Sequence, residues 1–386
     1  MDVLILGAGL MGSVLARDMA RQEQVEKVTL LDADEEKLQK LREGSFSKLE
    51  SLAADINDRD RIINLMKAHT VTINAMPERW SILVTKMAIE AGANLVDLTS
   101  SDTEKRLALH DTAREAGCTI LTGCGLAPGL TNILAGRAVS RMDSTEKLIA
   151  RVGGIPRYPQ PPLNYSIVFS FESVIEDCTT DAIALRDHQI VRLPALSEVD
   201  QVHFEGLGSL ESFVTNGLGT LPYVMAKKGV SSIVEKTLRY PGFADKMMTL
   251  RDLGLFEERE IFLKKGTASP KEMVTCVLTE KLQKEEDHDL VVFRLTAKGI
   301  LDGKKMECQF EMMDAYDEVE NVSAMARTTA YPTNIIARMV AQEVIKEKGV
   351  LPLETSVGEN EAVFRRMMEE LKSYGIIIKE NTYESD

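Results

Sequence analysis

The sequence predicts an α/β protein, in which a Rossmann-type doubly wound parallel sheet is followed by a second α+β domain with a mixed, largely antiparallel sheet. Strand and helix patterns alternate from residue 1 to about residue 142, and a glycine-rich turn joins the first strand to the first helix. Successive strand–helix units with short links imply parallel strands with helices on both faces. From about residue 147 strand-like stretches follow one another, which predicts the second domain. A chain of 386 residues is long enough for two such domains.

The first strand, residues 3–6, runs into the sequence GAGLMG, and an amphipathic helix follows over residues 12–21. In this arrangement Gly7 allows a sharp turn, Gly9 lets a pyrophosphate approach the backbone, and Gly12 lets the helix pack close to the strand. The free N–H groups of the helix then face the phosphates. The residues expected to contact a dinucleotide here are Gly7, Gly9, Leu10, Met11 and Gly12. The alternative is a glycine turn in an α/β fold that binds no nucleotide.

A second strand, residues 28–31, ends at Asp32, twenty residues after Gly12. An acidic side chain at this place accepts a hydrogen bond from a ribose 2′-OH and repels a 2′-phosphate. Asp34 adds negative charge, and no arginine lies between Leu31 and Lys37. We therefore expect the cofactor to be NAD rather than NADP.

Further strands and helices of the first domain follow in alternation. The expected strands are residues 48–53, 71–75, 94–98 and 119–121, and the expected helices are residues 35–42, 58–67, 82–91 and 103–116, with Gly92 and Gly117 as the stops of the last two. In such sheets ligands bind beyond the carboxyl ends of the strands. The cofactor contacts expected there are Asp32, Asp55, Ala75, Met76, Pro77, Thr99 and, from the turn at residues 123–129, Leu126 and Pro128.

The second domain is predicted from its strand-like stretches. These are residues 148–152, 165–171, 190–193, 201–204, 231–237, 290–298 and 306–313, and the helices between them are residues 223–227, 243–253 and 271–280. A long helix over residues 333–348 is expected to begin after Pro332 and to stop at Gly349, and a last helix covers residues 359–373. The charged run at residues 281–289 is expected to be a solvated loop.

Composition excludes several classes of function. The formal net charge is −14 and no basic stripe is visible, so nucleic acid and anionic membranes are not expected partners. The five cysteines form no C-x-x-C pair and the five histidines show no metal-ligand spacing, so we expect reduced thiols, a cytoplasmic location and no metal site. No apolar run reaches the length of a membrane span, and Met1 leads directly into the first strand, so no signal peptide is expected.

Four ordered motifs resemble the saccharopine dehydrogenase family. They are the glycine turn, GCGLAPGL at residues 123–130, GGIP followed by PPLNY within residues 153–165, and EKTLRYPG at residues 235–242. Within the family the sequence looks most similar to the NAD-dependent lysine 6-dehydrogenases. This resemblance implies a dinucleotide domain at residues 1–143, a catalytic and dimerisation domain at residues 144–325, and C-terminal helices at residues 326–386 that return to the dinucleotide domain. It also implies a homodimer joined through the sheet of the middle domain.

Candidate catalytic and substrate-binding residues follow from these motifs. Asp97 closes a strand at the cofactor edge and can place a water or accept a proton, or it can simply cap a loop. Tyr165 can donate to the substrate or be a core aromatic residue. Arg239 is a fork for a substrate carboxylate or a partner in a structural ion pair. The other expected substrate contacts are Gly154, Asn216 and Thr220.

The leading hypothesis is an NAD-dependent oxidoreductase that deaminates the ε-amine of L-lysine to 2-aminoadipate 6-semialdehyde and releases ammonia. Saccharopine reductases carry an additional arginine for a further carboxylate, and the matching residues 215–221 of this chain contain none. A substrate with a single carboxylate therefore fits better. The alternatives are a saccharopine or carboxynorspermidine type of dehydrogenase or reductase, and a dinucleotide-sensing module without catalysis.

Overall fold

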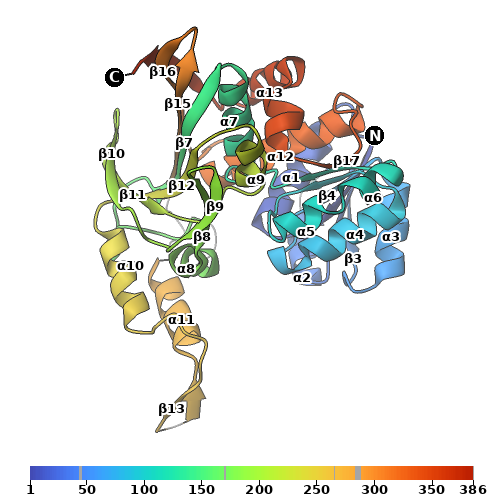
Figure 1. Cartoon of the computed structure of the whole chain (residues 1–386). Coiled ribbons are helices and arrows are strands. Elements are labelled where there is room, and N and C mark those ends of the chain that lie inside the picture. The colour runs from blue at the N-terminus through green and yellow to red at the C-terminus, as the bar shows by residue number, and fades with distance from the viewer. Residues whose placement is uncertain (43–45, 169–170, 265, 283–287, 386) are drawn as a thin grey trace. The chain divides into compact units, whose positions relative to one another are not determined.

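The computed structural model describes residues 1–386 except 43–45, 169–170, 265, 283–287 and 386. The chain forms two compact units (Figure 1). The first unit contains residues 1–142, 219–224 and 326–377, and the second contains residues 143–218, 225–325 and 378–386.

The first unit is built on a seven-stranded sheet in which every pair of neighbouring strands is parallel. Its strands, in spatial order, are β17 (Gly349–Leu351), β6 (Thr119–Thr122), β5 (Leu95–Asp97), β4 (Val71–Asn74), β1 (Asp2–Leu6), β2 (Lys27–Asp32) and β3 (Leu49–Ala53). The strand order reverses between β4 and β2 on either side of β1, as in a doubly wound sheet. This confirms the Rossmann-type fold class that the sequence predicts.

Helices connect the strands of the first unit. They are α1 (Leu10–Arg21), α2 (Glu35–Arg42), α3 (Arg59–Ala68), the short η1 (Glu78–Trp80), α4 (Ser81–Ala91), α5 (Thr103–Leu107), α6 (His110–Glu115) and α7 (Leu130–Ser140). Side chains of α3, α4 and α6 form one apolar cluster with the strands, in which Ile62, Met87 and Ala113 are fully buried. The single helix expected over residues 103–116 is therefore wrong, because the chain turns at Ala108 and Leu109 between α5 and α6.

The C-terminal part of the first unit contains α12 (Ala324–Ala341), η2 (Glu354–Gly358) and α13 (Glu361–Ser373). The expected helix over residues 333–348 is wrong at both ends, since α12 begins nine residues earlier and Pro332 lies inside it. A proline within a helix costs about 3 kcal/mol. Residues 330–340 are buried throughout, so tertiary packing outweighs this cost.

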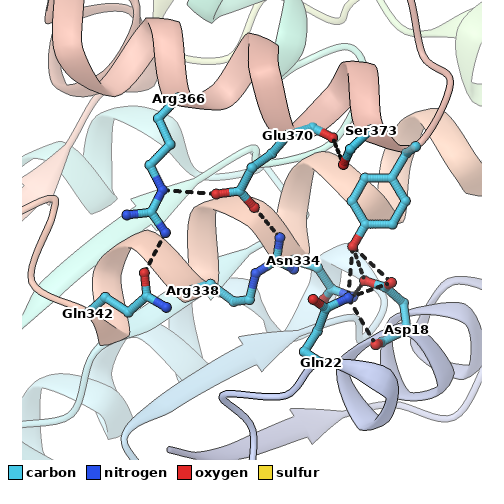
Figure 2. Close-up of polar contacts among 9 residues, drawn as sticks. Asp18, Gln22, Asn334, Arg338, Gln342, Arg366, Glu370 and Ser373 are labelled. Carbon is cyan, nitrogen blue, oxygen red and sulfur yellow. Dashed lines mark hydrogen bonds and ion pairs between the residues drawn. The ribbon is translucent and has the colours of Figure 1, made fainter.

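A polar network joins α12 and α13 to α1 (Figure 2). The Asp18 carboxylate on α1 accepts hydrogen bonds from Asn334 Nδ2 at 2.6 Å and from Tyr374 Oη at 2.9 Å. Arg338 forms an ion pair with Glu370, which links α12 to α13. Burial raises the pKa of Asp18, and its hydrogen bonds oppose that shift. The network fixes the C-terminal helices against the helix that begins at the glycine turn.

The second unit is built on a nine-stranded sheet. Its main path is β10 (Asp200–Phe204), β11 (Gly208–Val214), β12 (Ser232–Arg239), β7 (Ser144–Pro156), β15 (Asp289–Leu301), β16 (Lys304–Ala315) and β18 (Lys379–Glu384), while β8 (Ala182–Arg186) pairs with β12 and with β9 (Gln189–Leu193). The β12–β7 pair is parallel and the other pairs are antiparallel. This confirms the predicted mixed, largely antiparallel sheet.

The helices of the second unit are α8 (Phe171–Thr179), α9 (Leu221–Lys227, which begins in the first unit), α10 (Phe243–Asp252) and α11 (Pro270–Leu282). A strand over residues 165–171 is wrong, because residues 165–167 have no regular structure and α8 begins at Phe171; residues 169–170 lie outside the described part. The buried side chains of α8 are Phe171, Val174, Ile175 and Cys178, which is the spacing of one helix face. Part of the charged run at residues 281–289, residues 283–287, also lies outside the described part, but α11 extends to Leu282 and β15 begins at Asp289.

A small hairpin, β13 (Ile261–Leu263) and β14 (Gly266–Ala268), extends away from the rest of the second unit (Figure 1). In the part of the chain that the structure describes, these two strands pair only with each other. Phe262 at its end is 91% exposed. No described helix in either unit is long and apolar enough to cross a bilayer.

Candidate functional site

The glycine turn after β1 has the backbone geometry that its sequence predicts. Gly7 has φ +99°, and a Cβ there would lie 2.8 Å from the Ala75 carbonyl oxygen. A Cβ on Gly12 would overlap the Gly7 carbonyl oxygen. Among the described atoms, by contrast, nothing lies within 4 Å of a Cβ built on Gly9. Gly7 and Gly12 are thus required by the protein's own packing, and Gly9 faces open space.

The helix α1 begins at Leu10, directly after Gly9, and carries no acidic residue in its first turn. Its first N–H groups have no partner within the helix, and they lie at the positive end of the helix dipole. Leu10 is 52% exposed and Met11 is buried. An open backbone over Gly9 beside a helix N-terminus is what the pyrophosphate of a dinucleotide requires.

Asp32 at the end of β2 lies against this turn. Its Oδ2 accepts a hydrogen bond from the Ala8 N–H at 2.7 Å, and its Oδ1 accepts one from the Asp34 N–H at 2.9 Å. Two backbone groups therefore fix the orientation of the carboxylate. Hydrogen bonds from the backbone of Lys37 and Glu36 lower the pKa of Asp34, a second carboxyl group close to Asp32.

The other expected cofactor residues follow the carboxyl ends of the strands. Ala75, Met76 and Pro77 follow β4, and the Ala75 N–H donates to the Leu6 carbonyl of β1 at 2.8 Å. Asp55 follows the outermost strand β3, where its Oδ1 accepts a hydrogen bond from the Asn57 N–H at 2.8 Å. The structure thus brings Ala75 next to the glycine turn and places Asp55 at the far strand of the same sheet edge.

The turn at residues 123–129 connects β6 to α7 at this edge. The Gly123 N–H donates to the Thr99 carbonyl and the Cys124 N–H to the Asp97 carbonyl, both at 2.9 Å. A Cβ on Gly129, which has φ +134°, would overlap Gly125. Leu126 is buried and Pro128 is half-buried. The turn is therefore held to the end of β5 by its backbone.

Asp97 is fully buried, and its carboxylate is engaged by neighbouring residues. Arg106 Nη2 pairs with its Oδ2 at 2.6 Å, while the N–H and the hydroxyl of Thr99 both donate to Oδ1 at 2.8 Å. These contacts give Asp97 the loop-capping role that the sequence leaves open as an alternative. Arg106, which is 1% exposed, is not predicted from the sequence, because a lone arginine on a helix carries no motif.

Thr220, an expected substrate contact, lies in a buried polar cluster of the first unit. Its hydroxyl donates to Glu354 Oε2 at 2.9 Å, and Asn132 Nδ2 approaches the same oxygen at 3.4 Å. Asn132 Oδ1 in turn accepts from the Gly129 N–H at 3.2 Å, so the cluster reaches the turn after β6. Burial raises the pKa of Glu354 to about 7. Sequence reasoning misses Glu354 because it misses β17, whose carboxyl end lies three residues before it.

Tyr165 and Arg239 meet in the second unit. The Arg239 guanidinium lies over the rings of Tyr165 and Phe243, 4.9 and 5.6 Å from their centroids. Its Nη1 donates to the Leu238 carbonyl at 2.9 Å, and its Nη2 lies 3.9 Å from Asp177 Oδ2. Tyr165 is 1% exposed, and burial raises the pKa of its hydroxyl. Stacking on the two rings fixes the plane of the Arg239 guanidinium, and the N–H groups along its edge can donate hydrogen bonds to a carboxylate.

The structure places Gly154 and Asn216 in packing roles. A Cβ on Gly154, in β7, would overlap Met325 and would lie 2.8 Å from Val168. Asn216 is exposed, and its Oδ1 accepts from the Ile183 N–H of β8 at 3.2 Å. Within the described residues, neither Gly154 nor Asn216 hydrogen-bonds to Arg239 or Tyr165, so these two candidates do not join that pair.

Comparisons with known proteins agree over nearly the whole chain. Residues 3–121 match the saccharopine dehydrogenase NADP binding domain, and residues 125–376 match the saccharopine dehydrogenase C-terminal domain. The chain is 24% identical to saccharopine dehydrogenase (NADP(+), L-glutamate-forming) of Pyricularia oryzae over 98% of both chains. It is 23% identical to carboxynorspermidine synthase of Vibrio alginolyticus over 92% of both chains.

A solved structure shows the same fold. The apo saccharopine dehydrogenase (L-Glu forming) of Saccharomyces cerevisiae aligns with a TM-score of 0.81 over 99% of both chains, at 20% identity. The two family matches and the open glycine turn agree on a nicotinamide dinucleotide as cofactor. The chain therefore belongs to the saccharopine dehydrogenase family, and it is an oxidoreductase of that family.

Proposed function

We propose that this enzyme oxidises the ε-carbon of L-lysine with NAD, giving 2-aminoadipate 6-semialdehyde and ammonia. The observation that carries the proposal is Arg239, a buried guanidinium whose planar edge fits one carboxylate. The matching segment for a further carboxylate, residues 215–221, contains no arginine. A substrate with one carboxylate therefore fits this chain better than saccharopine, which has three.

The cofactor would be held by the glycine turn, by the N-terminus of α1 and by Asp32. When bound, it supplies a nicotinamide ring that accepts hydride. The residues of this chain orient the cofactor: Gly9 lets the phosphates approach the backbone, and the Asp32 carboxylate accepts a hydrogen bond from the ribose 2′-OH. Asp97 and Thr99 hold the end of β5 to the following turn, so they position rather than react.

The choice of NAD over NADP rests on Asp32 and Asp34. A 2′-phosphate near two carboxylates would meet like charges, which cost several kcal/mol at contact for an effective dielectric constant of about 20. Several relatives are named for NADP, among them the Pyricularia and Saccharomyces enzymes. We therefore expect this chain to differ from them at the ribose, where its carboxylate is fixed by Ala8.

The substrate amine must be neutral before hydride leaves its carbon, because an ammonium nitrogen has no lone pair to stabilise the cation that forms. The rate should therefore rise from neutral pH toward about 10, where the free amine of lysine begins to lose its proton. Burial in an apolar site would shift this rise to lower pH.

A saccharopine or carboxynorspermidine type of reaction is the second candidate, and the named relatives favour it. Product analysis with lysine labelled at the ε-nitrogen separates the two. Labelled ammonia together with the 6-semialdehyde, or its cyclic imine, is the result expected. Turnover with saccharopine alone, or label released only from the α-nitrogen, would reject the lysine assignment. A protein that binds NAD but reduces none with any amine would be a sensor.

We also propose a homodimer in the cytoplasm. Exposed apolar side chains of the second unit support a protein contact: Phe262 and Leu263 on the hairpin are 91% and 49% exposed, and Val277 on α11 is 57% exposed. The five cysteines are free, which suits a reducing compartment. Light scattering of Phe262→Asp beside the unchanged protein tests the contact, since a dimer of unchanged mass would show that the hairpin is not part of it.

A further inference from the structure

Three polar side chains stand in a row on the central strand β12 of the second unit. Glu235, Thr237 and Arg239 alternate along the strand, so they point to the same face of the sheet. The same face carries Phe213, which lies opposite Thr237 and stacks on Phe243. It also carries the buried Glu211, which lies opposite Arg239 and accepts hydrogen bonds from the N–H groups of Gly242 and Ala244. All three polar residues are less than 8% exposed. Such a row in an apolar core is costly unless its groups are partnered.

The guanidinium of Arg239 is only partly partnered. A buried guanidinium has five N–H groups to satisfy. Within the described residues its Nε has no hydrogen-bond partner, and its Nη2 is too far from Asp177 for a hydrogen bond. Nε and one Nη form the edge that binds carboxylates in a bidentate manner. The structure therefore leaves the carboxylate-binding edge of a buried, stacked arginine unsatisfied.

Acidic groups lie beside this edge. Asp177, on α8, is 39% exposed at its side chain, whereas the Arg239 side chain is 8% exposed, so Asp177 marks the side from which solvent reaches the row. Glu235 lies deeper, where Thr215 donates to its Oε2 at 3.2 Å and Thr215 and Thr237 share a hydrogen bond of 2.8 Å. Burial and the nearby Asp177 raise the pKa of Glu235 to about 8. Asp177 is therefore the more exposed of the two acids, and it lies on the solvent side of Arg239.

The spacing of Arg239 and Asp177 matches a zwitterion. In an α-amino acid the amine nitrogen and the carboxylate oxygens are about 3 Å apart. A cation and an anion 3.9 Å apart, held in a loose pair, offer each of these groups an opposite charge. A bound head group would replace the 3.9 Å pair with two closer ion pairs, one between its carboxylate and Arg239 and one between its ammonium and Asp177. Its carboxylate would also accept a hydrogen bond from Arg239 Nε.

We propose that Arg239 and Asp177 form a receptor for the α-amino acid head group of the substrate, with the guanidinium on the carboxylate and Asp177 on the α-ammonium. The inference rests on the proposed function, because it takes the substrate to be an amino acid with a distal amine. Glu235 and its two threonines support the strand beneath Arg239. The α-amine is bound as an ammonium and so cannot lose hydride from its carbon, which leaves the distal amine as the reacting group.

The test is calorimetric titration of the full-length enzyme with NADH present, so that no turnover occurs. Three ligands are compared: L-lysine, 6-aminohexanoate without the α-amine, and 1,5-diaminopentane without the carboxylate. Asp177→Asn should weaken lysine binding at least about tenfold and leave 6-aminohexanoate unchanged. Arg239→Lys, which keeps the charge and loses the fork, should weaken lysine and 6-aminohexanoate and leave 1,5-diaminopentane unchanged. Asp181→Asn, an exposed acid just after α8, is the matched control and should change none.

Each result decides the proposal. If Asp177→Asn weakens lysine and 6-aminohexanoate equally, or weakens neither, Asp177 does not bind the α-ammonium and the receptor is rejected. The comparison is independent of which reaction the enzyme performs. If the unchanged enzyme binds saccharopine and not lysine, the proposed function fails, and the same variants are titrated with saccharopine and with its analogue lacking the lysine-derived α-amine. Loss of the selective effect there rejects the receptor as well.

Discussion

The two proposed ligand sites differ in their physical basis. At the glycine turn of the first unit the proposed contacts come from the backbone, because Gly9 is open and the first N–H groups of α1 have no partner within the helix. In the second unit the proposed contacts come from side chains, and Arg239 is placed by the rings of Tyr165 and Phe243, which come from distant parts of the chain. A backbone site depends on a few consecutive residues, whereas the side-chain site depends on the packing of a whole layer.

The sharpest contrast lies within the glycine turn itself. Gly12→Ala puts a methyl group into the Gly7 carbonyl, so we expect a lower melting temperature and loss of NAD binding by more than about a hundredfold. Gly9→Ala meets no described atom, so it should keep the melting temperature and still weaken NAD. Thermal melts and NAD titration of both variants measure the difference. Full NAD affinity in Gly9→Ala would show that the cofactor does not approach this backbone.

Removing the side-chain fork breaks the second site. Arg239→Ala should cost about 2–5 kcal/mol in kcat/KM for lysine, chiefly through KM, because the substrate carboxylate loses its partner. Steady-state kinetics give the split between kcat and KM. Arg192→Ala, an exposed arginine on β9, serves as the control. A variant with unchanged KM and a normal melting temperature would end the assignment.

The buried acid of the second unit should be visible in the pH dependence of stability. Burial raises the pKa of Glu235 from 4.5 to about 8. The folded-state value is the higher one, so the protonated carboxyl stabilises the fold fully below about pH 4.5, and this contribution is lost as the pH rises through about 8.

Glu235→Gln keeps the shape and cannot ionise. Between about pH 6 and about pH 8.5 the unchanged protein should lose about 2 kcal/mol more unfolding free energy than the variant. Urea unfolding at the two pH values measures this, with the exposed Glu205→Gln as control. Parallel pH curves for the protein and Glu235→Gln would mean that Glu235 does not titrate in this range.

The smallest expected effect concerns cofactor choice. Asp32→Asn removes the charge but keeps an oxygen for the Ala8 N–H, so the fold of the turn should survive. The preference for NAD over NADP, as the ratio of kcat/KM values, should fall about tenfold. Asp60→Asn, exposed on α3, is the control. An equal ratio in Asp32→Asn and the unchanged enzyme, or a preference for NADP from the start, would contradict our interpretation of Asp32.

The comparison also explains what the sequence can and cannot predict. As the sequence predicts, the glycine turn joins β1 to α1 and Asp32 ends β2, because both features depend on local order along the chain. Glu354 was missed because β17 has only three residues, too few to show the alternating apolar and polar pattern by which a strand is predicted. Residues 165–171 were wrongly predicted to be a strand, because the apolar residues near Phe171 fit the spacing of a strand as well as that of a helix. The side chains that α8 buries show that the helical spacing is the correct one. Asp177 belongs to no motif. It became a candidate only because the fold brings it close to Arg239, which lies 62 positions further along the chain on another element.

The return of the C-terminal segment to the first sheet has a consequence for how the chain is made. As the ribosome releases the protein, β6 emerges more than two hundred residues before β17, its neighbour in the sheet. Until then β6 is an open edge, and Asp18 lacks Asn334 and Tyr374. The first unit therefore stays incomplete until residues 326–377 have emerged, whereas most strands of the second unit are available to pair before then. A nascent chain stalled before residue 326 should thus be captured by chaperones through its first unit.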